Sequence, residues 1–191
     1  YPLSNKNCYD RLWKTVDKVH YISSDLYDKA LKLGLSKSVP SKKITPAIDV
    51  NKFDTSHGMR SSLDSSKIKL LTIGRLHWKK GYVDTIQALA LLKQSGIKFN
   101  YKIIGDGPEY ERIAYAAYQM GLADQVSFLG RLDHKDVKTH LEEADIYIQY
   151  SIQEGFCNAV LEAQAMGKLC VVSDAEGLSE NVLNGETGWV I

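Results

Sequence analysis

The chain has 191 residues, of which 44% are hydrophobic and 25% are charged, a balance typical of a globular protein with a buried core. Its formal net charge is +1, which excludes a broad electrostatic attraction to nucleic acid or to an anionic membrane, so we expect no nucleic-acid partner. No apolar run reaches the roughly 20 residues that cross a bilayer, and no signal peptide is expected.

The first part of the chain predicts only a piece of an α/β unit. Lys18–Ser23 indicates a strand, Leu26–Gly34 a helix that ends at a glycine, and Lys43–Thr45 another short strand. One such unit cannot bury its apolar faces alone, so Tyr1–Thr45 is expected to be the edge of another domain. Pro46–Ser66 is polar and without a clear period, which predicts a linker.

From residue 69 onward, short apolar runs alternate with amphipathic stretches of helical period. The runs are continuous in Ile, Val, Leu and Tyr, which indicates strands that are buried on both faces. This alternation predicts an α/β fold with a Rossmann-like parallel sheet and helices on both of its faces. The six expected strands are Lys69–Gly74, Phe99–Gly105, Gln125–Gly130, Asp145–Tyr150, Leu169–Ser173 and Gly188–Ile191.

The two parts predict two domains, residues 1–50 and residues 51–191. Because the sequence stops directly after its last strand, we expect the second domain to lack its final helices and the chain to be a piece of something longer. Ligands of parallel sheets bind at the carboxyl ends of the strands, so we expect the loops there to carry the chemistry.

The first of these loops runs from Gly74 to Gly81, with Arg75 near one end and Lys80 near the other. Arg75 offers a planar fork suited to phosphate oxygens, and Lys80 a point charge near a helix N-terminus. With backbone amides, these two side chains would neutralise a diphosphate. The alternative is that the lysines of the loop are solvated and Arg75 makes a local ion pair. The loop is not a P-loop, because the Gly-x4-Gly-Lys-Ser/Thr pattern is missing.

A second loop, Gly105-Asp106-Gly107, follows the next strand and opens a helix, as a dinucleotide-binding fingerprint does. However, Tyr110 stands where that fingerprint has its third glycine, and Pro108 suits a first helical turn. A nicotinamide site and a plain tight turn therefore both stay open for this loop.

The strongest pattern is Glu154-Gly-Phe-Cys-Asn-Ala-Val-Leu-Glu162. The helix expected from about Asn158 to Met166 is nearly all small and apolar, which indicates burial. A carboxylate inside it needs hydrogen-bond donors, and the vicinal hydroxyls of a ligand would supply them. The alternative is that Glu162 pairs with an internal Arg or Lys and that Glu154 is solvated.

The start of this helix also favours an anionic ligand. Gly155 allows close approach of the backbone, and the amides of Phe156 and Cys157 are expected to point at an anion from the helix N-terminus. The three cysteines, Cys8, Cys157 and Cys170, have no metal-ligand spacing and leave one over if two pair. This favours a reduced cytoplasmic compartment and no metal site.

The spacing of seven residues between Glu154 and Glu162, set in Glu-Gly-Phe-x-Asn-x-x-x-Glu-Ala-x-Ala-x-Gly, resembles the E-x7-E motif of the family-four retaining glycosyltransferases. Further segments are similar to motifs of this family in the same order, so the resemblance covers nearly the whole chain. These segments are Tyr21–Ser24, Ala47–Asp49, Gly74–Gly81, Ile104–Glu109, Val126–Gly130, Ala144-Asp145 with Ser151, Ser173 with Gly177 and Glu180, and Gly185–Gly188.

The resemblance implies the GT-B architecture of two facing Rossmann-like lobes. Residues 1–50 would be the remnant of the N-terminal acceptor lobe with the interlobe crossing, and residues 51–191 the C-terminal nucleotide-sugar-binding lobe. It further implies a hexosyltransferase-type enzyme that transfers the sugar of a nucleoside-diphosphate sugar to an acceptor hydroxyl with retained anomeric configuration, without a metal or other cofactor. Without most of the acceptor lobe, this chain alone is expected to be inactive.

The family's site residues carry over by position. Arg75 and Lys80 would hold the donor diphosphate, Glu162 the ribose hydroxyls, and Glu154 the sugar, not as a nucleophile. Arg131 and Leu132 would line the base pocket. Arg75, Lys80 and Glu154 are thus the catalytic set; the donor-binding set is Gly74, Gly105, Asp106, Arg131, Leu132, Gly155, Phe156, Cys157, Asn158 and Glu162. Cys157 and Tyr150 depart from residues that are frequent in the family.

Two other functions stay open: a sugar-nucleotide epimerase of the same fold, which lacks the Glu-x7-Glu spacing, and a non-catalytic nucleotide-binding module. The expected partners are a nucleotide-sugar donor and a glycan, lipid or small-molecule acceptor. The expected location is cytoplasmic, and the full-length enzyme could also contact the inner membrane face peripherally.

Overall fold

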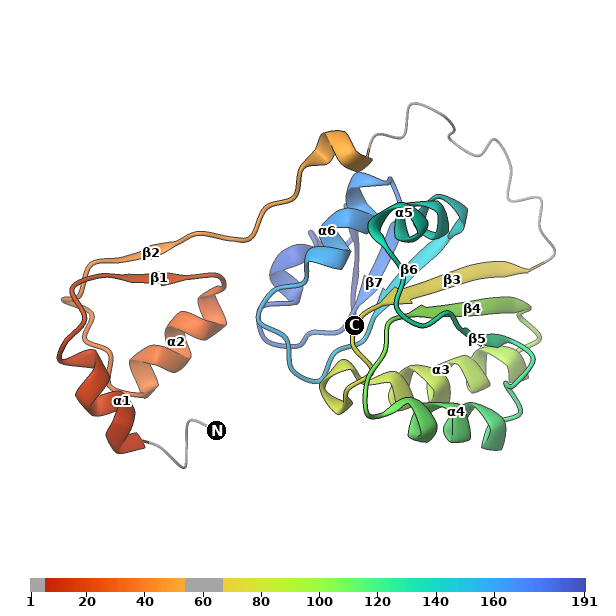
Figure 1. Ribbon diagram of the computed structural model, residues 1–191, viewed down its shortest axis with the longest axis horizontal. Helices are drawn as coiled ribbons and strands as arrows, with labels where there is room; N and C mark the ends of the chain where they lie inside the picture. The colour runs from red at the N-terminus through yellow and green to blue at the C-terminus, as the bar shows by residue number, and fades with distance from the viewer. Residues whose placement is uncertain (1–5, 54–66) are drawn as a thin grey trace.

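The computed structural model describes residues 6–53 and 67–191, which form two sheets of unequal size (Figure 1). The larger sheet has six parallel strands in the order β5-β4-β3-β6-β7-β8. Its strands are β3 (Ile68–Ile73), β4 (Phe99–Ile104), β5 (Val126–Phe128), β6 (Ile146–Gln149), β7 (Leu169–Val172) and β8 (Gly188–Val190). All six strands predicted from residue 69 onward are present, and the predicted Rossmann-like parallel sheet is confirmed.

Helices cover both faces of this sheet, as predicted (Figure 1). On one face, α3 (Tyr82–Gln94) and α4 (Tyr110–Gln119) lie side by side and contact each other. On the other face lie α5 (His134–Glu143), which contacts β3, and α6 (Asn158–Ala165), which contacts β6 and β7.

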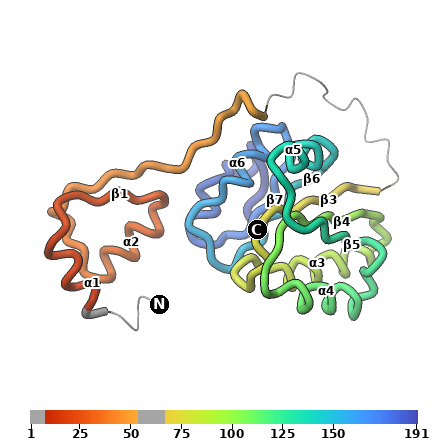
Figure 2. The backbone as a smooth tube through the Cα atoms, in the orientation of Figure 1, coloured from red at the N-terminus to blue at the C-terminus, as the bar shows by residue number. Residues whose placement is uncertain are grey.

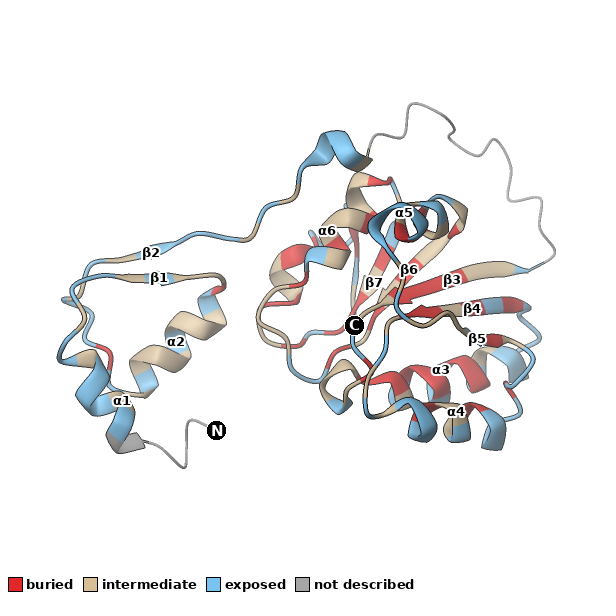
Figure 3. Cartoon of the chain, in the orientation of Figure 1, coloured by how far each residue is buried: buried red, intermediate tan, exposed pale blue. Residues whose placement is uncertain are grey.

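Neighbouring residues of β3 pack into two separate cores. Leu70 belongs to the core under α3 and α4, with Ile86 and Tyr101. Leu71 belongs to the core under α5 and α6, with Leu141. Figure 3 shows these buried residues along the strands and on the helix faces that are turned toward them. A strand covered on both faces needs apolar side chains at successive positions, which explains the continuous apolar runs in the sequence.

The smaller sheet pairs β1 (Val19–Tyr21) in parallel with β2 (Ser41–Lys43), and α2 (Ser24–Lys32) connects them. The strand predicted at Lys43–Thr45 is wrong by two residues. Val19 lies opposite Ser41, and the paired residues end at Lys43. Ile44 lies beyond them: its N–H donates to the Tyr21 carbonyl at 2.9 Å, and its carbonyl oxygen lies 3.3 Å from His20 Nε2. Pairing with β1, rather than the β-propensity of the side chains, therefore sets the position of β2.

A further helix, α1 (Lys6–Trp13), precedes β1 and was not predicted. The Trp13 indole N–H donates to the carbonyl of Leu33, at the end of α2, over 3.0 Å. This contact between distant residues holds α1, and such a contact has no signature in the local sequence.

Residues 44–49 leave β2 without regular structure and lead to the short 3₁₀ helix η2 (Val50–Phe53), a path that Figure 2 traces. The prediction of a linker over Pro46–Ser66 did not include η2. Phe53 packs against the core on the α6 side of the sheet, and this burial explains the ordered turn. The rest of the predicted linker, 54–66, lies outside the described residues, and the boundary at residue 50 stays a prediction.

The β1-α2-β2 unit is attached to the segment after β7 by charged groups. Lys29 pairs with Glu176, and Lys43 pairs with Glu180. Glu180 also accepts the backbone N–H of Ser24 at 2.6 Å. Although burial raises the pKa of Glu180, the hydrogen bonds from Lys43 and the Ser24 amide outweigh it and hold that pKa below its ordinary value. The carboxylate is thus the shared anchor of the unit.

Candidate functional site

The strand order reverses between β3 and β6. From β3 the chain continues to β4 and β5 on one side, and then returns to β6 on the other side of β3. In open parallel sheets, ligands bind in the crevice that such a reversal leaves at the carboxyl ends of the two strands. The loop from Gly74 to Gly81 follows β3, and the loop from Tyr150 to Cys157 follows β6. The Gly74–Gly81 loop and the start of the Glu154–Glu162 pattern therefore flank the expected ligand site.

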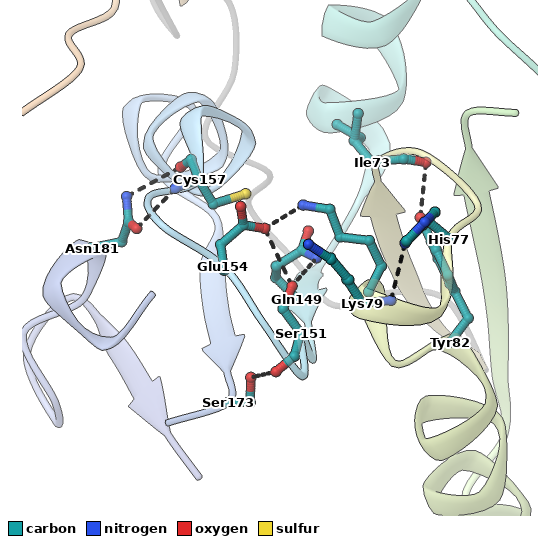
Figure 4. Close-up of polar contacts among 12 residues, drawn as sticks. Ile73, His77, Lys79, Tyr82, Gln149, Ser151, Glu154, Cys157, Ser173 and Asn181 are labelled. Carbon is teal, nitrogen blue, oxygen red and sulfur yellow. Dashed lines mark hydrogen bonds and ion pairs between the residues drawn. The ribbon is translucent and has the colours of Figure 1, made fainter. Parts of the chain in front are cut away.

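An ion pair between Lys80 and Glu154 joins these two loops across 74 residues of sequence (Figure 4). The Lys80 side chain is 20% exposed and that of Glu154 is 15% exposed, so neither is a solvated surface charge. The neighbouring Lys79 differs, since its ammonium lies 5.7 Å from the centre of the Trp78 ring. The alternative that the predicted charges are merely solvated is thus contradicted for Lys80 and Glu154.

Glu154 is also the end of a chain of buried polar side chains. Its carboxylate accepts from the Ser151 hydroxyl at 3.4 Å, and Ser151 accepts from the Gln149 amide at 3.0 Å. Gln149 in turn accepts from the Tyr147 hydroxyl at 2.9 Å. Tyr147 and Gln149 are not among the predicted site residues, although a glutamine after the apolar Ile146–Ile148 run is a visible signal in the sequence.

The short 3₁₀ helix η3 (Trp78–Lys80) presents Lys80 to the site. His77 begins this helix, and its Nδ1 accepts the backbone N–H of Lys79 at 3.3 Å. Gly81 ends η3 and α3 starts directly after it, so a cation stands just before a helix N-terminus. This is the local arrangement that the sequence predicted for Lys80.

The Gly105-Asp106-Gly107 loop supports the Gly74–Gly81 loop rather than presenting a free backbone. The Asp106 carbonyl accepts the N–H of Leu76 at 2.7 Å. A Cβ on Gly107 would lie 2.3 Å from the Leu76 carbonyl oxygen, and one on Gly105 would lie 2.0 Å from that of Gly74. Both glycines are therefore explained by backbone packing between the two loops. This accounts for the pattern without a nicotinamide site, while the predicted donor contacts of Gly105 and Asp106 stay predictions.

The two arginines of the predicted site are exposed and available. Arg75 and Arg131 follow β3 and β5 at the same edge of the sheet. Within residues 6–53 and 67–191, neither side chain has a hydrogen-bond or ion-pair partner. The local ion pair considered for Arg75 is thus not found there. Leu132, the other predicted base-pocket residue, is partly buried against the α5 and α6 core.

The start of α6 differs from its expected state. The backbone N–H of Cys157 donates to the side-chain oxygen of Asn181 at 3.1 Å, and the Asn181 amide donates to the Cys157 carbonyl at 3.1 Å (Figure 4). In this arrangement the Cys157 amide is therefore not free to meet an anion, contrary to expectation. Burial raises the pKa of the Cys157 thiol, so this group stays protonated and is not a nucleophile. Asn158 is exposed, and Phe156 and Gly155 are half-buried.

Glu162 is half-buried on α6, one turn after the first residue of the helix, and Glu154 lies in the loop before it. Burial raises the pKa of its carboxyl group, and the nearby His134 only partly opposes this effect. Glu162 has no hydrogen-bond or ion-pair partner in the part of the chain that the structure describes. The alternative that it pairs with an internal Arg or Lys is thus not found, and its oxygens are available to a ligand.

The part of the chain that the structure describes has neither a cluster of metal ligands nor a membrane-spanning helix. Between 6 and 53 and between 67 and 191 there is no group of three or more His, Cys, Asp or Glu side chains placed to hold a metal ion. The same ranges contain no helix that is long and apolar enough to cross a membrane. All three cysteines are free thiols.

Known proteins with similar sequences carry glycosyltransferase names. A putative colanic acid biosynthesis glycosyltransferase of Salmonella typhimurium, WcaL, is 30% identical over 192 residues, covering 96% of this chain and 46% of the relative. The amylovoran biosynthesis glycosyltransferase AmsK of Erwinia amylovora is 30% identical over 195 residues, covering 97% and 46%. The chain therefore spans about half the length of the curated relatives that it matches.

Solved structures show the same fold. The Anabaena protein HepE, in complex with UDP and glucose, superposes with a TM-score of 0.84 at 22% identity, covering 100% of this chain and 53% of that one. The lipopolysaccharide biosynthesis glycosyltransferase WaaG superposes with a TM-score of 0.77 at 19% identity, covering 90% and 48%. These likenesses support the GT-B fold alone. The family model described as "Glycosyl transferases group 1" matches residues 58–191, and the chain therefore belongs to the group 1 glycosyltransferases.

Proposed function

We propose that this chain binds a nucleoside-diphosphate sugar and that, in the whole protein, the sugar is transferred to an acceptor hydroxyl with retained anomeric configuration. The observation that carries the proposal is the Lys80–Glu154 pair at the carboxyl ends of β3 and β6. A cation and a carboxylate side by side match the two ends of the bond to be broken. The cation suits the phosphate, and the carboxylate suits the sugar hydroxyls.

Arg75 and Lys80 bind the diphosphate in this proposal. Arg75 is exposed and unpaired within the described ranges, so it engages phosphate oxygens without breaking another contact. Lys80 exchanges part of its contact with Glu154 for a phosphate oxygen. As the sugar–phosphate bond breaks, negative charge grows on the diphosphate, and fixed positive groups next to it lower the barrier.

Glu162 binds the ribose and Glu154 the transferred sugar. A carboxylate that has no protein partner among the described residues can accept two hydrogen bonds from hydroxyl groups, and the 2′- and 3′-hydroxyls of ribose form such a pair. Arg131 and Leu132, after β5, border the base. The loop at 155–158 lies against sugar and phosphate. The group proposed here is a hexosyl group, and the reaction uses no metal or other cofactor.

Retention without a protein nucleophile is favoured by the state of Glu154. This carboxylate is engaged by Lys80 and Ser151, a setting that stabilises its charge and holds it as an acceptor. The acceptor hydroxyl then attacks from the face that the diphosphate leaves, with the leaving phosphate as the base. The relatives are about twice as long as this chain. We therefore propose that the remainder of the whole protein positions the acceptor and excludes water, and that these 191 residues alone bind donor without transferring it.

The names of the relatives narrow the chemical class of the acceptor. WcaL and AmsK are named for the biosynthesis of colanic acid and amylovoran, which favours a glycan acceptor over a small molecule. HepE was crystallised with UDP and with UDP-glucose, which makes uracil the first base to test. We place the full-length enzyme in the cytoplasm, with peripheral contact at the inner membrane face as the route to a lipid-linked acceptor.

The test compares diphosphate and nucleoside binding in Arg75→Ala. Calorimetry with UDP, GDP and ADP identifies the base. A lost charge-assisted bond should then weaken diphosphate binding by about 10-fold or more, while the bare nucleoside binds as before. Arg112→Ala is the matched control, because Arg112 is an exposed arginine of α4 that pairs with Glu109. Equal losses for diphosphate and nucleoside, or no nucleotide binding by the unmodified chain, would overturn the proposal.

A further inference from the structure

The hydrogen bonds that end on Glu154 all point in one direction. An ionised carboxylate has only acceptors, so the Ser151 hydroxyl must give its single proton to Glu154. The lone pairs of Ser151 then accept from the Gln149 Nε2 amide, which turns the Gln149 oxygen toward the Tyr147 hydroxyl. Every donor in the series therefore faces the carboxylate, and every acceptor faces away from it.

These groups lie deep in the fold. Gln149 is fully buried and Ser151 is 2% exposed, so water cannot replace a missing partner. Burial raises the pKa of Tyr147 well above its ordinary value, which keeps its proton available as a donor. The Ser173 hydroxyl donates to the Ser151 carbonyl at 2.6 Å, and the Thr72 hydroxyl donates to the Ile148 carbonyl at 2.6 Å. The backbone that carries the series is thus fixed on both sides.

Glu154 has one partner that must move and one that need not. In the proposed function, Lys80 turns toward the donor diphosphate, which removes part of the charge that holds Glu154 in place. The Ser151–Glu154 distance of 3.4 Å is long for a hydrogen bond, as expected where an ammonium group shares the same oxygen. Once Lys80 contacts phosphate, Ser151 is the remaining donor, and Gln149 holds its hydroxyl in the right rotamer.

We propose that Gln149 and Ser151 are positioning residues, which hold the Glu154 carboxylate at the donor sugar while Lys80 serves the diphosphate. The inference rests on the proposed function, because it requires the sugar to lie against Glu154. It assigns a role to a buried glutamine, a polar side chain whose burial in the strand otherwise costs desolvation free energy. Tyr147 and Gln149 thereby become part of the donor site without touching the donor.

The experiment measures the affinity gain that the sugar brings, as the ratio of the UDP to the UDP-glucose dissociation constant. If calorimetry shows that the chain prefers guanine or adenine over uracil, GDP with GDP-mannose or ADP with ADP-glucose replaces the uridine pair. In Ser151→Ala the ratio should fall by about 10-fold, while the UDP constant stays within about 2-fold. Gln149→Met, which keeps the length and removes both polar groups, should lower the ratio in the same way. Ser151→Thr keeps the hydroxyl and should restore it.

Ser173→Ala is the matched control. Ser173 is also buried and also bonded within this cluster, but its hydroxyl reaches the Ser151 carbonyl and not the Glu154 carboxylate. It should lower stability without changing the ratio. A double-mutant cycle gives the second test: in the Glu154→Gln background, Ser151→Ala should have little further effect on the ratio, because both act through one group.

Each outcome decides between the two proposals. If the unmodified chain binds neither nucleotide nor nucleotide sugar, the proposed function fails and takes this inference with it. If the chain binds both and Ser151→Ala keeps the wild-type ratio, only the positioning role fails. Equal weakening of UDP and UDP-glucose in Ser151→Ala, or a ratio lowered as much by Ser173→Ala, would make the cluster a purely structural one.

Discussion

Replacing Lys80 by methionine should separate its structural task from its task in binding. Loss of one partner from a buried ion pair costs about 3–5 kcal/mol, and loss from an exposed pair less than about 1 kcal/mol. The side chains of Lys80 and Glu154 are 20% and 15% exposed, and Ser151 still donates to the remaining carboxylate. We therefore expect Lys80→Met to lower the free energy of unfolding by about 1.5–3 kcal/mol.

Adding Glu154→Gln should restore most of that stability, because the carboxylate charge that has lost its ammonium partner is gone and the amide oxygen still accepts from Ser151. The affinity for UDP should behave differently. A charge-assisted bond contributes about 1.5–3 kcal/mol, so binding should weaken roughly 10- to 150-fold in Lys80→Met and stay weak in the double variant.

Urea denaturation gives the stabilities, and calorimetry with UDP gives the affinities. Lys79→Met is the matched control, since this lysine belongs to the same 3₁₀ helix but lies over the Trp78 ring. It should change stability little and leave UDP binding within about 2-fold. Two results would refute the reasoning: a double variant as unstable as Lys80→Met, or a double variant that regains UDP affinity.

Three further predictions concern other parts of the chain. The unmodified chain should prefer a ribonucleoside diphosphate over its 2′-deoxy form by roughly 5- to 150-fold, and Glu162→Gln should reduce that preference. Because burial raises the pKa of Glu162, the preference should also decrease as the pH falls through the raised pKa. Calorimetry with both nucleotides across pH measures both effects. The Lys43–Glu180 attachment should be complete above the ordinary carboxyl pKa of 4.5 and be lost as the pH falls through the lowered pKa of Glu180, which hydrogen exchange in β1 and α2 would report; unchanged protection at acid pH would contradict it. Gly177→Ala should destabilise the chain by about 2 kcal/mol or more in urea, because a Cβ there would lie 1.9 Å from the Gly155 carbonyl oxygen, and a variant of wild-type stability would show that the backbone yields.

The parts of the site that sequence predicted are those encoded by neighbouring residues. Glu154 and Glu162 lie in one helix and the loop before it, and Lys80 lies just before another helix, so local sequence was enough to single them out as candidates. The parallel sheet could be predicted for the same reason, because the periodicities of strands and helices are visible in short stretches of sequence. The meeting of Lys80 with Glu154 depends on the strand order instead, and only the reversal between β3 and β6 brings them together.

Contacts between distant segments account for what was missed. The Asn181 clamp on Cys157 spans 24 residues, and nothing in the residues around either partner indicates it. The same holds for α1, which depends on the reach of Trp13 to Leu33. Gln149 is intermediate: its polarity within an apolar strand was a visible anomaly, but its partners became clear only from the fold.

The 3₁₀ helix η4 (Ser179–Asn181) contacts two separate parts of the molecule. One of its residues, Glu180, anchors the β1-α2-β2 unit, and the next, Asn181, clamps the start of α6. We expect a ligand that moves the start of α6 to change the free energy of attachment of that unit, and by reciprocity attachment would then change ligand affinity by the same amount. Substitutions such as Lys43→Met, which touch no nucleotide, are thus expected to alter nucleotide affinity, and equal affinities in both proteins would show that η4 transmits nothing.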